Sequence, residues 1–182
     1  GMLGGTPLPG GRRPFYFPGG RIEGDRLYIV ERSYNNLLVF DVSRPLEPRF
    51  ERIVPFRTDA TPSDVLRLGG DLIVAVGGGG LWRLPLANTA RVQPERLLDH
   101  WDFVKRVEPY PSADDARWLL VADNFDGGLR VVSLVEGQPP AVPLAFQTGT
   151  FCDSLLAYDG FVLLANRTHG VLVVDITRPW RP

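Results

Sequence analysis

Three aspartates, each close to the start of a short apolar segment, are the residues of this sequence best suited to bind a cation. They are Asp64, Asp102 and Asp153. Carboxylate oxygens are ligands of hard cations such as calcium, and three of them held together would raise one another's pKa unless a cation lay between them. The alternative is that each aspartate caps the tight turn that leads into its strand. We expect no cofactor other than such a calcium ion.

A second set of residues is suited to binding a ligand. Several of them occur in short turns: Asn124, Asp126, Asn166, Arg167 and His169. His100 and Trp101 directly precede Asp102, and alternation along a strand would place His100 and Asp102 on one face. Arg167 could pair with an anionic ligand, and Trp101 could serve as an aromatic platform. Two histidines are too few for a zinc site without help from carboxylates.

The motifs of common catalytic sites are absent from the sequence. It has no His-Glu-x-x-His and no Gly-x-Ser-x-Gly, and the glycines at 77–80 are not followed by the Lys-Ser/Thr of a phosphate loop. Cys152 could act as a nucleophile only in contact with His100 or His169. A buried thiol that packs as a small hydrophobe is the simpler interpretation. We therefore assign no catalytic residue.

The elements that must position these residues repeat along the chain. Apolar segments begin at residues 37, 81, 129 and 171, a spacing of 44, 48 and 42 residues. The first and last are nearly the same: NLLVFDVSRP at 36–45 and GVLVVDITRP at 170–179. Asp41 and Asp175, followed by Ser/Thr-x-Pro, are expected to close structural turns. Each repeat contains short β-rich segments bounded by turn residues, with no convincing helical period.

A unit of four strands that repeats every 40 to 50 residues is typical of a propeller blade. The sequence therefore predicts an all-β propeller of four four-stranded antiparallel blades. We expect a lead-in at 1–11 and one domain at 12–182, with blades at about 18–58, 61–98, 101–148 and 151–182. The first strand of each blade and the turn between its second and third strands should meet at one rim. The candidate residues above would converge there.

The fourth unit ends before its outer strand, which raises the question of how the ring closes. The one spare β-rich segment is Arg12–Phe17, and we predict that it pairs beside Val171–Asp175. Three alternatives remain. The chain could be half or a fragment of a larger propeller, two copies could form one larger ring, or copies could pair through open strand edges.

The repeated units resemble the LVIVD-repeat family of β-propeller proteins, whose third strand ends in a motif like GLRVVDVSDPANP. The residues that carry the resemblance are those at 36–48 and 170–179, and DNFDGGLRVV at 123–132. In the second unit Pro85 stands where the family has aspartate. The resemblance implies the propeller fold and favours an extracytoplasmic location. It implies no activity, because propellers host unrelated functions.

Composition excludes several classes of function. The chain has 182 residues, 20 Lys and Arg against 21 Asp and Glu, and one cysteine. This balance predicts no nucleic-acid partner, and one cysteine excludes an internal disulfide framework. The longest uncharged apolar run, Leu72–Trp82, is too short to span a bilayer, so we expect no membrane insertion. No signal-peptide pattern is visible in this sequence.

The predicted function is a non-catalytic module that recognises a small ligand or a protein partner through its rim turns and channel mouth. One alternative is a metal-assisted hydrolase or lactonase-like enzyme, with Asp64, Asp102 and Asp153 around the metal. Another is a structural fragment of a larger surface protein. A homodimer is compatible with each of the three.

Overall fold

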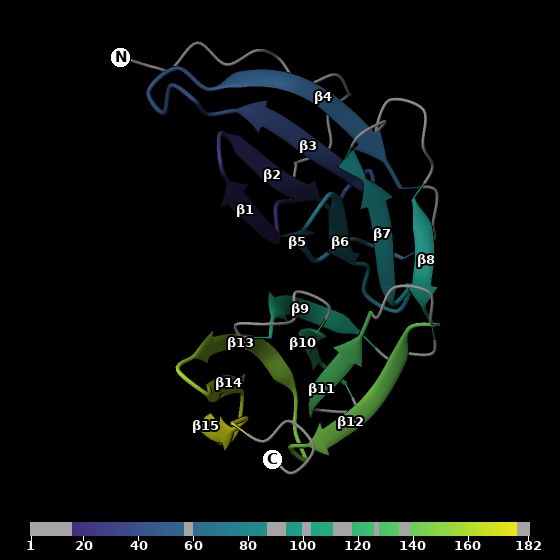
Figure 1. Cartoon of the computed structure of the whole chain (residues 1–182), viewed down its shortest axis with the longest axis vertical. Coiled ribbons are helices and arrows are strands. Elements are labelled where there is room, and N and C mark those ends of the chain that lie inside the picture. The colour runs from purple at the N-terminus through teal and green to yellow at the C-terminus, as the bar shows by residue number, and fades with distance from the viewer. Residues whose placement is uncertain are drawn as a thin grey trace.

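The structure is a computed structural model, and it describes residues 16–56, 60–86, 94–99, 103–110, 118–125, 128–134 and 139–177. These residues form four antiparallel sheets, one after another along the chain, with no α-helix among them (Figure 1). The all-β prediction and the division into four sheets are confirmed. In the described part of the chain, no helix is long and apolar enough to cross a membrane.

The strand bounds follow the repeats found in the sequence. The first sheet contains β1 (Gly19–Glu23), β2 (Arg26–Glu31), β3 (Asn36–Asp41) and β4 (Arg49–Pro55). The second contains β5 (Asp64–Leu68), β6 (Asp71–Ala75), β7 (Leu81–Pro85) and β8 (Glu95–Leu98). The third contains β9 (Val104–Pro109), β10 (Trp118–Asp123), β11 (Gly128–Ser133) and β12 (Ala141–Gln147). The fourth contains β13 (Cys152–Tyr158), β14 (Phe161–Asn166) and β15 (Gly170–Asp175).

Tight turns set the register within the sheets. Tyr158 pairs with Phe161 across a two-residue turn in which Asp159 and Gly160 both have positive φ, 46° and 79°. Such turns match the twist of the strands they join and favour Asp-Gly. At the same end of the sheets, the Asp175 carboxylate accepts the N–H of Thr177 at 2.9 Å, as Asp41 accepts that of Ser43 at 2.8 Å. Both aspartates therefore have the structural role predicted for them.

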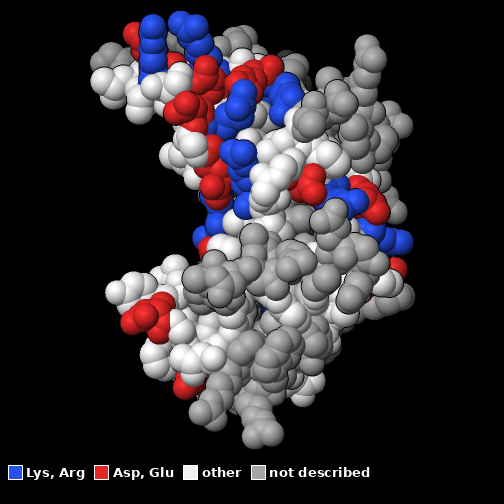
Figure 2. All heavy atoms as spheres, in the orientation of Figure 1, with Lys and Arg blue, Asp and Glu red and all other residues white. Residues whose placement is uncertain are grey.

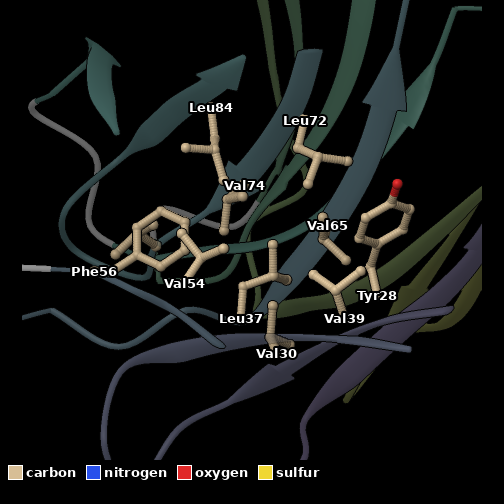
Figure 3. Close-up of a cluster of buried hydrophobic side chains, with 11 residues drawn as sticks. Tyr28, Val30, Leu37, Val39, Val54, Phe56, Val65, Leu72, Val74 and Leu84 are labelled. Carbon is tan, nitrogen blue, oxygen red and sulfur yellow. The ribbon is translucent and has the colours of Figure 1, made fainter. Parts of the chain in front are cut away.

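The hydrophobic core is divided among the three junctions between consecutive sheets. In the first junction, Tyr28, Val30, Leu37 and Val39 of the first sheet pack against the second sheet's Val65, Leu72 and Val74 (Figure 3). A second cluster joins β5–β7 to β9–β11, and a third joins β10–β11 to β13–β15. Each of the two middle sheets therefore buries both of its faces, as the apolar character of successive residues in its strands requires.

The four sheets form an arc in which the first strand of each sheet lies on the inner side (Figure 1). These inner strands contact one another in chain order, β1 with β5, β5 with β9 and β9 with β13. Among the described residues, no strand of the first sheet shares a substantial contact with the fourth sheet. The arc is therefore open between its first and last sheets.

The predicted closing strand, Arg12–Phe17, lies mainly outside the described residues. Its last two residues, Tyr16 and Phe17, are not in a strand. The Tyr16 carbonyl accepts the N–H of Arg32 at 2.9 Å, which places Tyr16 at the end of β2 in the first sheet. The fourth sheet has three strands in the described part of the chain. Pairing of the Arg12–Phe17 segment with β15 stays a prediction.

Candidate ligand-binding rim

Asp64, at the start of β5, links the second sheet to the third. Its side chain is 1 % exposed, and its Oδ2 accepts the backbone N–H of Val107 at 3.0 Å. The guanidinium of Arg106 lies 3.5 Å from its Oδ1. Burial raises the pKa of Asp64, and the attraction of Arg106 only partly offsets this. The Asp64 carboxylate therefore links β5 to β9 inside the junction between the second and third sheets.

Asp153, on β13, has a different environment. Arg167 donates to both of its carboxylate oxygens, at 2.6 and 3.1 Å, and the Asn124 amide donates to Oδ1 at 2.8 Å. Hydrogen bonding to Arg167 lowers the pKa of Asp153. The Lys105 ammonium is 4.0 Å from the same carboxylate. Three of the predicted ligand-binding residues, Asn124, Asp153 and Arg167, thus come together, joined by a residue that the sequence did not single out.

The register explains why Asp64 and Asp153 do not occupy equivalent places. In β5, Asp64 is paired with Ala75 on β6. In β13, Ser154 is paired with Ala165 and Cys152 with Asn166, so that Asp153 is the extra residue of a β-bulge. Because side chains alternate between faces, a bulge redirects the residues beside it. Asp64 and Asp153 therefore have different partners, and the ring of three aspartates stays a prediction.

The described residues contain no cluster of three His, Cys, Asp or Glu side chains arranged to hold a metal ion. The third predicted aspartate, Asp102, lies outside the described residues, as do His100, Trp101 and Asp126. Asn166 is buried and accepts a hydrogen bond from the Thr148 hydroxyl at 3.4 Å. His169 is exposed, and its Nδ1 is 3.3 Å from the hydroxyl of Thr168.

Cys152 is fully buried in the core between the third and fourth sheets. Burial raises the pKa of its thiol to about 11. Its described polar contact is a weak one with the Ser154 carbonyl, at 3.7 Å. The thiol therefore packs as a small hydrophobe, which agrees with the simpler of the two interpretations of the sequence.

An aromatic residue precedes the inner strand in three of the four sheets. These residues are Tyr16, Phe103 and Phe151. The carbonyl of each accepts the N–H of the residue that follows the second strand of the same sheet: Arg32 at 2.9 Å, Asn124 at 2.9 Å and Arg167 at 3.3 Å. One repeated backbone contact therefore places three aromatic rings at the same rim.

The rings at this rim contact one another and nearby cations. Phe125 lies edge-to-face with both Phe103 and Phe151, with centroids 5.6 and 5.7 Å apart. Three cations approach ring faces: Arg32 at 5.8 Å from Tyr16, Lys105 at 5.7 Å from Phe103, and Arg167 at 5.0 Å from Phe151. Phe125 is 58 % exposed and Tyr16 57 %. We call this surface, formed by Tyr16, Arg32, Phe103, Lys105, Phe125, Phe151 and Arg167, the aromatic rim.

A pocket of about 200 Å³ opens within the aromatic rim, where the four inner strands begin. Its lining includes three cationic side chains, Arg32, Lys105 and Arg106, and the carboxylate of Asp153. Lys105, like Asp153, is the extra residue of a bulge, because Arg106 and Val104 pair with successive residues of β10. Bulges are over-represented beside binding sites, where they redirect a side chain.

Charged side chains continue from the pocket along the inner strands. Arg21 of β1 and Arg106 of β9 share the Glu108 carboxylate, at 2.6 and 3.1 Å. This network joins the first sheet to the third. Figure 2 shows basic and acidic side chains alternating over the upper half of the arc, down to its concave edge. The inner strands of the first and third sheets therefore meet through charged side chains, whereas the junctions between sheets are apolar.

The sequence interpretation missed the aromatic rim. Its signal was an aromatic at the residue before β9 and before β13, Phe103 and Phe151, with Tyr16 before β1. The aromatic pattern is irregular in the sequence, because the number of residues between the ring and the strand differs among the sheets.

No protein-family model matches the chain, and no curated protein matches its sequence. Solved structures resemble its fold. A putative 6-phosphogluconolactonase from Bacteroides uniformis superposes with a TM-score of 0.70 at 14 % identity, over 89 % of this chain and 56 % of that one. BamB from Moraxella catarrhalis superposes with a TM-score of 0.58 at 18 % identity, over 88 % and 47 %. The computationally designed Ika4 protein gives 0.63 at 12 % identity, over 91 % and 94 %.

At identities this low, the superpositions show the fold alone. They confirm the propeller-type architecture. The chain spans about half the length of the two natural proteins and nearly all of Ika4.

Proposed function

We propose that the chain is a non-catalytic binding module, and that the aromatic rim recognises a ligand or partner segment that combines an anionic group with an apolar or aromatic part. The observation that carries the proposal is the pocket in which Arg32, Lys105 and Arg106 lie with the rings of Tyr16 and Phe103. Phe103 in turn contacts the exposed Phe125 beside the pocket. Exposed aromatic residues gathered at one place are uncommon unless they bind something.

The cations of the pocket differ in how far they are already neutralised. Arg106 is paired with Asp64 and Glu108. The exposed Arg32 contacts the Tyr16 ring and has no ion pair with any carboxylate of the described chain. Lys105 is 4.0 Å from Asp153, at the limit of an ion pair. Arg32 and Lys105 are therefore the side chains with donors to offer an incoming anion.

The rings would supply the second half of the recognition. Phe125 and Phe151, 58 % and 36 % exposed, present apolar area beside Arg167. An apolar group that covers them would be removed from water, which stabilises the complex by about 25 cal/mol per Å² of buried apolar area. A ligand with both features would bind more tightly than one with either feature alone.

The test is an NMR titration of the ¹⁵N-labelled chain with an end-blocked Glu-Phe-Glu peptide. We expect shifts centred on Arg32, Lys105 and Phe125. The double variant Arg32→Gln/Lys105→Gln should weaken binding at least tenfold, which corresponds to about 1.4 kcal/mol. Arg44→Gln, which removes an exposed charge beyond the opposite end of β3, is the matched control and should bind as the wild type does.

Replacing the phenylalanine of the peptide with alanine separates the two contributions. The Glu-Ala-Glu peptide should bind the wild type more weakly than Glu-Phe-Glu does. The variant Phe125→Ser should weaken the binding of Glu-Phe-Glu and leave the affinity for Glu-Ala-Glu unchanged. Equal affinity of the wild type and the double variant for Glu-Phe-Glu would refute recognition by this pocket. So would peptide-induced shifts scattered over all four sheets.

A further inference from the structure

The fourth sheet leaves an apolar face uncovered at the end of the arc. Along β13–β15 side chains alternate between buried and exposed, so that one face is packed on the third sheet and the other is not. The exposed apolar residues of this face are Leu156 (56 % exposed), Tyr158 (72 %), Phe161 (43 %), Leu163 (36 %), Val171 (64 %) and Val173 (62 %). Figure 2 shows this end of the arc as mainly white, with acidic side chains beside it.

The register shows which kind of face this is. Leu163 pairs with Val173 in the fourth sheet, as Tyr28 pairs with Val39 in the first. In the first sheet, Tyr28 and Val39 are fully buried because the second sheet covers them. The uncovered face of the fourth sheet therefore corresponds to the face that, in the first sheet, packs against the next sheet along the chain.

The opposite end of the arc carries the complementary kind of face. In the second, third and fourth sheets this side packs against the preceding sheet. In the first sheet it includes Ile22, which is 64 % exposed, and the half-buried Leu27, Ile29 and Phe40. The two ends of the arc are therefore unlike each other, and each resembles one half of an existing junction.

We infer that two copies of the chain associate head to tail, the fourth sheet of each packing on the first sheet of the other, to close one ring. Unlike surfaces that pair head to tail give a closed ring when the rotation fits. The arc superposes on about half of chains up to twice its length, 46 % of the designed Ika8 protein and 47 % of BamB. The arc therefore matches about half of each of those two chains. Both aromatic rims would then open at the same end of one channel.

The first measurement is the solution mass by light scattering after size exclusion. We expect twice the 20.2 kDa of one chain for the wild type. Val173→Asp and Ile22→Asp each place a charge on one of the two faces, at positions that are exposed in the single chain, and each should reduce the mass to that of one chain. Leu46→Asp, at an apolar residue 87 % exposed outside both faces, is the control and should leave the mass doubled.

Mixing the two variants tests the head-to-tail arrangement. Ile22→Asp retains an intact fourth sheet and Val173→Asp an intact first sheet, so the mixture has one good junction and should form a heterodimer that neither variant forms alone. Circular dichroism should show all three variants to be folded, and it separates loss of association from loss of structure.

Three outcomes would overturn the inference. A wild-type chain that is monomeric over a wide dilution series would show that no second copy covers these faces. A dimer unaffected by Ile22→Asp would mean that fourth sheets pair with each other. A mass that keeps growing with concentration would mean that the rotation does not close and that copies form open chains.

Discussion

Strands β3 and β15 have nearly the same sequence and opposite environments. In β3, Leu37 and Val39 are fully buried, whereas the equivalent Val171 and Val173 of β15 are 64 % and 62 % exposed. The register places these residues on equivalent faces of their sheets, because Val39 pairs with Tyr28 as Val173 pairs with Leu163. The difference comes from the second sheet, which covers β3, and from the lack of a described sheet over β15. Whether a residue is buried in this fold depends on whether another sheet covers its face. Each repeat has an apolar face suited to such a junction, even where no described sheet covers it.

The carboxylates follow the same division. Asp64, in the middle of the arc, is buried and tied to the next sheet. Asp153, on the last sheet, has a side chain 33 % exposed and forms its ion pair with Arg167 of its own sheet's turn. Both carboxylates also contact the third sheet, Asp64 through Val107 and Asp153 through Asn124. They differ in burial, because Asp64 lies inside a junction and Asp153 lies at the open rim.

Truncation of the equivalent apolar residues should separate the two environments most strongly. Leu37→Ala should lower the free energy of unfolding by about 2–5 kcal/mol, because it leaves a cavity in a packed core. Val171→Ala should change it by no more than about 0.5 kcal/mol, as an exposed position does. Both are measured by urea unfolding in an Ile22→Asp background, which keeps the chain monomeric. Equal losses would show that part of the same chain covers Val171.

The two aspartates offer a comparison of intermediate size. Asp64→Ala leaves the buried Val107 N–H without its acceptor and should lower the free energy of unfolding by about 1–3 kcal/mol. Asp153→Ala removes a partly exposed ion pair and should lower it by no more than about 1 kcal/mol. Urea unfolding of the two variants in the same buffer tests the ranking, and the reverse order would contradict it.

The four sheets could be predicted from the sequence because their cause is local. Alternating apolar residues and turn pairs such as Asp159-Gly160 specify each hairpin without reference to the rest of the chain. The grouping of the aspartates could not be predicted, because it depends on register. One extra residue in β13 is enough to make Asp153 and Asp64 non-equivalent.

The aromatic rim could not be predicted from the sequence for a different reason. Phe103, Phe125 and Phe151 are far apart in sequence and meet only because two sheets stack with their inner strands together. Repeats of similar sequence predict that equivalent positions lie near one another. They do not say which of those positions will carry exposed side chains, because the stacking decides that.

The pH dependence of stability should distinguish the two aspartates by sign. The raised pKa of Asp64 means that its contribution is fully present below the ordinary carboxyl value of 3.8 and is lost as pH rises through the folded pKa. The lowered pKa of Asp153 means the opposite: its contribution is present above 3.8 and is lost as pH falls through the folded pKa.

Wild type should therefore lose stability relative to Asp64→Asn as pH rises above 3.8. Relative to Asp153→Asn, it should lose stability as pH falls below that value. Urea midpoints of the three proteins across this range provide the measurement, and slopes of the same sign would show that Asp64 is solvated and that the junction between β5 and β9 is open to water.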